Sequence, residues 1–215
     1  MKNLSLEEVD FNKPPKFNVE TFSFWNVKND LNYDCICLES QFTKDEVNDI
    51  IKFGRSFSFN KSKTQDGTEF SDIRRSYNSW IPPCQITQNL YRKLNELITD
   101  VNNKYFNFEL ISLEHLQHTE YDEDYDGEYE LHMDRFLNPS FPGSHRKLSF
   151  SIQLTDPSLY EGGDLLIYGG KDPHVANKSL GTINFFPSYI LHKVTPVTKG
   201  SRNSLVGWVS GPKFR

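Results

Sequence analysis

Three side chains in this sequence have the types and spacing to share one metal ion. His132 and Asp134 lie two residues apart in the aromatic-rich segment 129–134. Positions i and i+2 of a β-strand point to the same face, so the imidazole and the carboxylate would lie side by side. His192, in the segment 190–194, could supply a third ligand. Two histidines and one carboxylate on one face suit non-haem Fe(II), whereas a closed zinc site would need a fourth protein ligand.

The residues after His192 favour this interpretation over three unrelated surface side chains. Residues 192–202 read as a strand, a turn and a returning strand, with Pro196 and Gly200 near the turn. The return brings Arg202 close to the strand that carries His192. A guanidinium there could hold the far carboxylate of a dicarboxylic acid through two parallel hydrogen bonds, while the other end of the acid chelates the metal.

The pattern resembles the prolyl 4-hydroxylase-like branch of the Fe(II)/2-oxoglutarate-dependent dioxygenases and, within it, the bacterial PKHD-type hydroxylases. The resemblance is specific over about 118–210, weaker over 35–117, and does not reach residues 1–30. It implies a double-stranded β-helix, or jelly roll, with supporting helices. The motifs that carry it are His132-x-Asp134, Leu148-Ser149-Phe150-Ser151-Ile152-Gln153-Leu154, Tyr160-Glu161-Gly162-Gly163-Asp164-Leu165 and His192-x3-Pro196-Val197-x2-Gly200-x-Arg202.

The resemblance implies a hydroxylase that uses Fe(II), 2-oxoglutarate and O₂, with ascorbate as a supporting reductant. Its expected substrate is a prolyl residue in a peptide or protein. Two alternatives stay open: an oxygenase of a free amino acid or another small molecule, and a non-catalytic jelly-roll binding module. Nucleic-acid demethylases of the AlkB type share the HxD motif but carry a second arginine where this chain has Trp208, which argues against a nucleic-acid substrate.

The resemblance also implies roles for single residues. Arg202 and Tyr121 would bind the far end of 2-oxoglutarate, with Tyr125 as a rival because the gap after Tyr121 is longer than usual in the family. Many relatives carry Thr and Tyr where this chain has Ser149 and Gln153, so the cosubstrate pocket differs there. Core packing is the alternative role for each aromatic residue. The iron ligands would be His132, Asp134 and His192, and the substrate contacts would be Tyr129, Arg146 (with His145 as its alternative) and Trp208.

The elements that must position these residues read as mostly β. After residue 104, short runs of β-branched and aromatic residues alternate with Gly, Pro and Asp turns, which predicts a sandwich or barrel. Two helices are expected earlier, over 43–54 and 85–101, where apolar residues recur at helical spacing. The predicted fold class is α+β, mainly β, with both helices on one face of the β core. Strands are expected near 33–38, 73–81, 108–121, 129–134, 147–154, 164–168, 181–186, 190–196 and 202–209.

Local signals set the expected helix ends and domain limits. Thr43 lies three residues before Glu46, which is the spacing of a capping box. Gly54 is the expected stop of the same helix. We expect residues 1–33 to form an N-terminal extension and residues 34–215 to form a single dioxygenase domain.

Composition limits the classes of partner. The 215-residue chain carries a net charge of −5, three cysteines in no metal-binding spacing, and no apolar run long enough for a membrane helix. We therefore expect a cytoplasmic protein that binds neither membranes nor nucleic acid. Seven acidic residues fall within 120–130, which is either a solvated loop or a rim that attracts cationic peptides. The polar segment 57–71 is expected to be a loop that could close over a substrate.

Overall fold

The structure of the protein is a computed structural model, and most of it belongs to one compact unit, Asn32–Arg215. The expected N-terminal extension, 1–33, lies outside the described residues except for Tyr33, so its boundary stays a prediction. Most of the expected lid, the segment 57–71, also lies outside them. The described residues are 33–62, 73–134 and 144–213.

Two antiparallel β-sheets make up the core, and most of their strands are short. The larger sheet contains, in spatial order, β1 (Ile36–Leu38), β12 (Ile183–Pro187), β8 (His145–Gln153), β14 (Val197–Gly211), β6 (Leu116–Asp122), β4 (Tyr77–Ile81) and β2 (Asn60–Lys61), and β14 also pairs with β5 (Ser112–Leu113) and β9 (Tyr160–Gly162). The smaller sheet contains, in spatial order, β11 (His174–Val175), β10 (Leu165–Tyr168), β13 (Leu191–Val194), β7 (Glu128–His132) and β3 (Arg74–Arg75).

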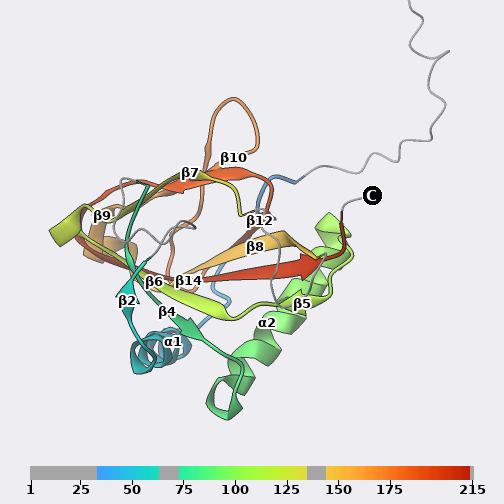
Figure 1. Ribbon diagram of the computed structural model, residues 1–215. Coiled ribbons are helices and arrows are strands. Elements are labelled where there is room, and N and C mark those ends of the chain that lie inside the picture. The colour runs from blue at the N-terminus through green and yellow to red at the C-terminus, as the bar shows by residue number, and fades with distance from the viewer. Residues whose placement is uncertain (1–32, 63–72, 135–143, 214–215) are drawn as a thin grey trace, which may run out of the picture. The chain divides into compact units, whose positions relative to one another are not determined.

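The two sheets form separate layers (Figure 1). Strands β7 and β10 lie in the upper layer of that view, above β6, β8 and β14. Two antiparallel sheets that face each other, with the chain passing between them, are the jelly-roll architecture that the sequence predicts. The interior between the layers is where side chains from both sheets can meet.

Two helices cover the outer face of the larger sheet. α1 (Lys44–Ser56) contacts β4 and β6, and both α1 and α2 (Gln88–Val101) lie below that sheet in Figure 1. No helix in the described part of the chain has both the length and the hydropathy needed to cross a membrane. Shorter helical turns occur at Gln85–Thr87, Asn102–Phe106, Glu123–Tyr125 and Pro157–Leu159.

The start of α1 agrees with the sequence prediction and its end does not. Thr43 and Glu46 form both hydrogen bonds of the capping box. The helix passes through Gly54 and ends at Ser56. Gly54 is needed for packing instead, because a Cβ there would come within 2.3 Å of Nδ1 of His118 on β6. The glycine therefore lets α1 lie directly against a buried imidazole.

Strand alternation separates an apolar layer from a polar interior. Along 148–153 of β8, the apolar residues join the core cluster under the helices, whereas the polar residues face the space between the sheets. The same alternation on β14 puts Leu205 and Val209 on the helix side. The interior residues of β14 are Arg202, Ser204, Val206 and Trp208.

Two of the expected strands are interrupted. The segment 73–81 splits into β3 and β4, which belong to different sheets, with Ser76 between them. The hydroxyl of Ser76 is buried and accepts a hydrogen bond from Nε of Arg74 at 2.9 Å, so polar contacts hold the chain where it changes sheet. The segment 108–121 likewise divides into β5 and β6. Part of the expected loop 57–71 forms β2, which pairs with β4.

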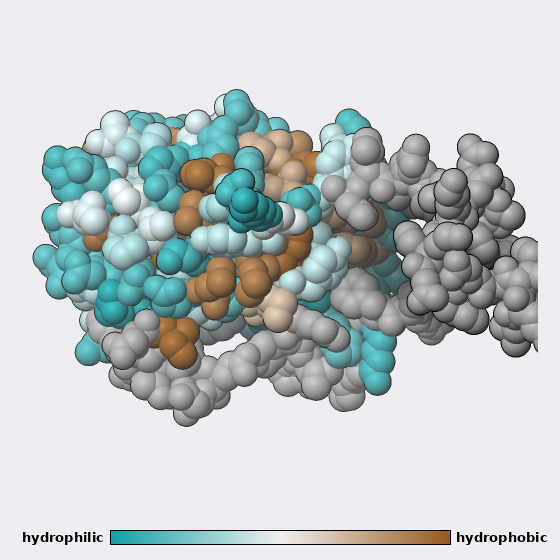
Figure 2. Space-filling model, turned by 90° about the horizontal axis from the view of Figure 1, so that it is seen from above, coloured by the Kyte–Doolittle hydropathy of each residue, from teal (hydrophilic) through white to brown (hydrophobic). Residues whose placement is uncertain are grey.

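The outer face of the smaller sheet carries an apolar surface (Figure 2). Viewed from above the molecule of Figure 1, brown apolar side chains gather in the middle of this face. Leu131 on β7 and Leu191 on β13 are 46% and 39% exposed. Because neighbours along a strand alternate, their outward direction places His132 and His192 on the interior face of the same sheet.

Candidate metal and cosubstrate site

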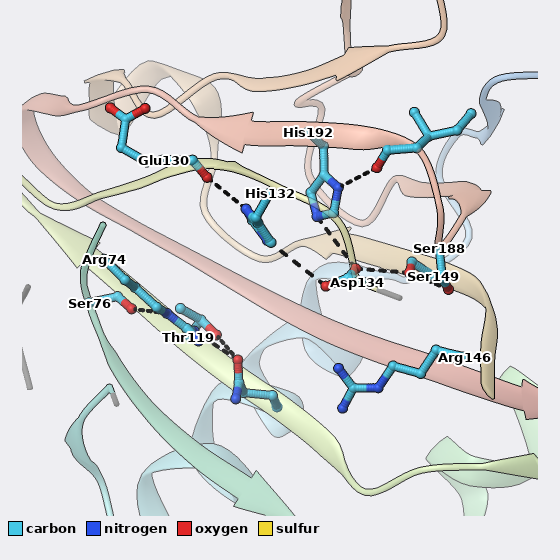
Figure 3. Close-up of polar contacts among 12 residues, drawn as sticks. Arg74, Ser76, Thr119, Glu130, His132, Asp134, Arg146, Ser149, Ser188 and His192 are labelled. Carbon is cyan, nitrogen blue, oxygen red and sulfur yellow. Dashed lines mark hydrogen bonds and ion pairs between the residues drawn. The ribbon is translucent and has the colours of Figure 1, made fainter. Parts of the chain in front are cut away.

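The structure brings His132, Asp134 and His192 together between the two sheets (Figure 3). One ligand atom from each lies within 4.8 Å of the other two. His132 and His192 are direct partners on the antiparallel strands β7 and β13, so both rings project from the same face. Asp134 lies just past the end of β7, and its carboxylate is 3.9 Å from Nε2 of His132 and 3.4 Å from Nε2 of His192.

Backbone carbonyls orient both imidazoles toward the centre of this cluster. Nδ1 of His132 donates to the carbonyl of Glu130 at 2.7 Å, and Nδ1 of His192 donates to that of Ile190 at 3.0 Å. A carbonyl can only accept, so Nε2 keeps its lone pair for a metal. Burial, reinforced by the nearby His192 and opposed by Asp134, lowers the pKa of His132 to about 4. His132 is therefore neutral at pH 7, which is the form that binds a metal.

Asp134 is held in place by hydroxyl groups from the opposite sheet. Ser149 on β8 donates to Oδ2 of Asp134 at 2.8 Å, and the hydroxyls of Ser149 and Ser188 are hydrogen-bonded at 2.8 Å. Burial by itself would raise the pKa of Asp134, but the two histidines and Arg146 lower it below its usual value. The side chain is therefore an ionised carboxylate with one oxygen fixed by Ser149 and the other available to a metal.

A pocket with an empty volume of ≈ 440 Å³ extends from these three residues to Arg202. Arg202 is 3% exposed, and no carboxylate among the described residues lies within ion-pair distance of its guanidinium. Tyr121 is its direct partner on β6, and the guanidinium carbon lies 5.6 Å from the centre of the Tyr121 ring. Gly163 makes room for the arginine, because a Cβ there would come within 2.9 Å of its Cδ. The pocket thus joins a metal-binding cluster to a buried cation.

Tyr125, the rival of Tyr121 in the sequence, lies outside this pocket. Its hydroxyl donates to the carbonyl of Glu120 at 3.1 Å, and its ring contacts that of Tyr77. Burial raises its pKa, so the phenol stays protonated. These contacts are structural, and they leave Tyr121 as the tyrosine beside Arg202.

The two predicted aromatic substrate residues both line the pocket. The ring of Tyr129 stacks on that of His132, with 3.6 Å between centroids. Trp208 is 6% exposed, and its indole N–H approaches Asp134 without reaching hydrogen-bond geometry. The ring of Trp80 on β4, which is 45% exposed, lies 6.0 Å from the Trp208 ring.

Arg146, the third predicted substrate residue, does not line the pocket. Its guanidinium makes three hydrogen bonds of 2.7–3.1 Å to the carboxylate of Glu114. The guanidinium carbon also lies 4.0 Å from the centre of the Trp208 ring. Arg146 is thus placed to hold Trp208 in position.

Arg74 lines the same pocket, although the sequence analysis did not select it. It is 8% exposed, donates from Nη2 to Oε1 of Gln117 at 2.8 Å, and lies 4.6 Å from the ring centre of Tyr129. Figure 3 shows its side chain reaching from β3 toward the interior. Pairing of β3 with β7 brings it there. No local signal in the run Arg74-Arg75 distinguishes it from a surface arginine.

The acidic side chains of the segment 120–130 do not line the pocket, although Tyr121 and Tyr129 of the same segment do. The segment forms the connection between β6 and β7, and Glu128 at the start of β7 is four residues, or about 13 Å, from His132. Three of its carboxylates pair with basic side chains inside the domain. These pairs are Glu120 with Arg55, Glu128 with Arg75 and Glu130 with Lys193.

The residues of the pocket fit an iron ion and a dicarboxylate. Two imidazoles and one ionised carboxylate on one side of a cavity make up the facial triad preferred by non-haem Fe(II). A buried guanidinium without a carboxylate partner is costly unless an anion binds to it, and Arg202 faces the same cavity. His132, Asp134 and His192 would therefore hold the metal, and Arg202 would hold the distal carboxylate.

Several solved structures with the same fold are prolyl hydroxylases. The Pseudomonas putida prolyl-4-hydroxylase matches with a TM-score of 0.67 and 19% identity, covering 84% of this chain and 94% of that one. A Trichoplax adhaerens prolyl hydroxylase was solved with a peptide fragment of the hypoxia inducible factor oxygen degradation domain. It matches with a TM-score of 0.67 and 18% identity, covering 83% of this chain and 84% of that one. A viral collagen prolyl hydroxylase of Paramecium Bursaria Chlorella virus-1 matches with a TM-score of 0.64 and 16% identity, covering 86% of this chain and 99% of that one. These likenesses confirm the predicted jelly-roll fold.

Sequence comparison gives matches to PKHD-type hydroxylases over part of the chain. A PKHD-type hydroxylase of Gloeothece citriformis is 47% identical over 62 residues, which is 29% of this chain and 28% of that protein. One of Idiomarina loihiensis is 37% identical over 91 residues, or 40% of each chain. The matches therefore span well under half of these relatives' lengths. The superfamily uses Fe(II) and 2-oxoglutarate, as its name states, and the predicted resemblance to PKHD-type hydroxylases is confirmed. Over residues 116–210, which carry His132, Asp134, His192 and Arg202, the chain matches the model of the 2OG-Fe(II) oxygenase superfamily.

Proposed function

We propose that the protein is an Fe(II)- and 2-oxoglutarate-dependent hydroxylase. One observation carries this proposal: the pocket has three metal-ligating side chains at one end and the buried, carboxylate-free guanidinium of Arg202 at the other. This arrangement fits a molecule with a chelating 2-oxo acid at one end and a carboxylate at the other. The superfamily match over 116–210 supports the same activity. A cytoplasmic location stays a prediction from the sequence.

The residues of the pocket have different roles in the proposed reaction. When bound, Fe(II) and 2-oxoglutarate supply the redox chemistry, in which 2-oxoglutarate and O₂ yield succinate, CO₂ and one oxygen atom inserted into a substrate C–H bond. Arg202 binds and orients the distal carboxylate, with Tyr121 beside it. The apolar walls exclude water from the reacting centre. These walls include Leu165, Phe186 and Val194.

A peptide or protein substrate, hydroxylated on a prolyl residue, is the finer part of the proposal. Among proteins with the same fold, the Trichoplax adhaerens hydroxylase was solved with a peptide fragment. In this chain, Trp208 lines the pocket and contacts the exposed Trp80, so the two rings form one aromatic surface. Aromatic surfaces are the usual partners of proline-containing segments. Ascorbate would act only as a reductant that keeps the iron active.

Mass spectrometry of peptides tests the proposed activity. The protein is incubated with Fe(II), 2-oxoglutarate, ascorbate and a library of proline-containing peptides, and we expect a mass gain of one oxygen atom on a defined proline. Peptides with alanine at that proline serve as matched controls and should remain unchanged. The His132→Ala and Asp134→Ala variants should give no product.

The same experiment separates the alternatives. Oxygen incorporation into free proline or another small molecule, with none into any peptide, would contradict the peptide substrate and support the small-molecule alternative. Iron and 2-oxoglutarate binding without turnover of any substrate would support a non-catalytic binding module. The intact set His132, Asp134, His192 and Arg202 argues against that module, because a chain that no longer catalyses a reaction would have little reason to keep all four.

A further inference from the structure

Trp208 and Ser149 face the carboxylate of Asp134 from the same side of the larger sheet. The two residues are direct partners on β14 and β8, so their side chains leave the sheet on one face. Ser149 donates to Oδ2 of Asp134 at 2.8 Å (Figure 3). The indole N–H of Trp208 approaches the same carboxylate. The carboxylate thus has two possible donors on neighbouring strands of the opposite sheet.

The indole N–H of Trp208 is a buried donor without an acceptor. The side chain is 6% exposed, and its Nε1 has no hydrogen-bond partner among the described residues. A buried donor without a partner destabilises the folded protein, and a hydrogen bond would recover that free energy. Because Nε1 is buried, the acceptor has to come from the protein or from a ligand. The carboxylate of Asp134 is the acceptor that it approaches, and a carboxylate can accept hydrogen bonds at both oxygens.

Neighbouring groups hold the indole in this direction. The guanidinium carbon of Arg146 lies 4.0 Å from the centre of the Trp208 ring. Glu114 fixes that guanidinium through three hydrogen bonds and accepts a further one of 2.7 Å from the hydroxyl of Ser210. The backbone N–H of Glu114 also donates to the carbonyl of Trp208 at 2.9 Å. Both the ring and the backbone of Trp208 are therefore fixed, and its N–H stays directed at Asp134.

We propose that Trp208 is a positioning residue of the metal site: its indole N–H donates to the carboxylate of Asp134 when the metal is bound and, together with Ser149, fixes the orientation of that ligand. Hydrogen-bond partners of a metal-ligating carboxylate commonly set its affinity for the metal. This role is additional to any contact of the ring with a substrate. The inference rests on the proposed function, since it takes His132, Asp134 and His192 to bind the metal.

Calorimetric titration of the full chain with Mn(II), without 2-oxoglutarate or substrate, is the first test. Trp208→Phe removes the N–H and keeps an aromatic ring beside Arg146, so it should raise the Kd for Mn(II) about tenfold or more. Trp80→Phe is the matched control. Trp80 does not line the pocket, so its replacement should leave the Kd for Mn(II) unchanged.

NMR of the indole N–H groups is a second test, and it does not depend on whether Trp208→Phe folds. The chain has three tryptophans, and Trp25→Phe and Trp80→Phe identify the signals of the other two. When diamagnetic Zn(II) binds, the indole proton of Trp208 should move downfield and exchange more slowly with solvent, because it gains a hydrogen bond to an anionic acceptor. A residue that only packs in the pocket would show neither change.

The possible results separate this inference from the proposed function. An unchanged Kd for Mn(II) in a Trp208→Phe protein that melts like wild type would overturn the positioning role. An indole signal of Trp208 that does not respond while wild type binds Zn(II) would overturn it as well. In both cases the metal site itself would remain. If wild type bound neither ion, the metal assignment in the proposed function would fail.

Discussion

Ser149 donates a hydrogen bond of 2.8 Å to Oδ2 of Asp134. Ser149 belongs to β8 of the larger sheet, whereas Asp134 follows β7 of the smaller one, so the bond ties the metal-binding carboxylate to the opposite wall of the pocket. Ser188 extends the chain by a further 2.8 Å contact. Both serines are fully buried, and no water is needed to complete their contacts.

Removing this hydroxyl should weaken metal binding. We expect Ser149→Ala to raise the Kd for Mn(II) by about 10–100-fold, because the carboxylate loses the partner that fixes its orientation. Ser149→Thr keeps a hydroxyl and should restore most of the affinity. Calorimetry in the absence of 2-oxoglutarate measures the effect. An unchanged Kd in a variant that melts like wild type would show that Asp134 does not depend on Ser149.

Replacing Arg202 should separate ligand binding from stability. In Arg202→Met we expect 2-oxoglutarate to bind at least about 100-fold more weakly, since a buried charge-assisted contact is lost. The free energy of unfolding of the ligand-free protein should not fall, because a buried cation without a carboxylate partner is removed.

A matched variant controls for the loss of a positive charge. Arg75→Met breaks the ion pair with Glu128 at the far end of β7 and leaves the pocket untouched. It should lower the midpoint of denaturant unfolding and preserve 2-oxoglutarate affinity. If both variants bound 2-oxoglutarate like wild type, Arg202 would not be its carboxylate partner.

The pair Glu114 and Arg146 should contribute measurably to stability. Their side chains are 12% and 16% exposed, so a double-mutant cycle with Glu114→Gln and Arg146→Met should give a coupling of about 1–3 kcal/mol, between the values for surface and buried pairs. Urea unfolding measures it. The pair Glu161 and Lys199 is exposed and should couple far less. If the coupling energy of Glu114 with Arg146 were no larger than that of Glu161 with Lys199, the proposed role of Arg146 in holding Trp208 in position would be contradicted.

His118 should make the fold sensitive to acid. Burial lowers its pKa to about 4, partly offset by the hydrogen bond to Asn203. The unfolded chain takes up this proton near pH 6.5 and the folded one only near pH 4, so stability is complete above pH 6.5 and decreases as the pH falls. The loss between these values is up to about 3 kcal/mol.

Comparison with a variant isolates this contribution. In His118→Gln, urea unfolding followed from pH 7 to pH 4 should show a shallower loss of stability than in wild type. His174→Gln changes an exposed histidine and should keep the wild-type slope. Parallel slopes for wild type and His118→Gln would mean that another group controls acid unfolding.

Two of the three candidate metal ligands could be predicted from the sequence because their geometry is local. The i, i+2 spacing of His132 and Asp134 puts both on one side of a strand or its immediate continuation, whatever the rest of the chain does. Arg202 follows from a hairpin that begins at His192. His192 is a candidate third ligand in the sequence, but no local spacing places it beside His132. The strand pairing that makes the two histidines direct partners does so.

Other parts of the site depend on contacts that no local pattern encodes. Arg74 reaches the pocket because β3 pairs with β7, although the two strands are more than fifty residues apart. Ser188 meets Ser149 through the pairing of β12 with β8. Residues 148–153 alternate between apolar and polar side chains, which predicts a strand with one polar face. The polar face of a strand usually contacts solvent. Here the smaller sheet covers that face, and the polar side chains therefore lie inside the pocket.

Succinate formation is the measurement that tests the central claim most directly. The wild-type protein, given Fe(II), O₂, ascorbate, 2-oxoglutarate and the library of proline-containing peptides, should convert 2-oxoglutarate to succinate, and a chelator should stop the reaction. His132→Ala, Asp134→Ala and Arg202→Met should each abolish it, whereas Arg75→Met should not. Succinate formation that survived in Asp134→Ala, or its absence in a wild-type protein that binds Fe(II) and 2-oxoglutarate, would contradict the account.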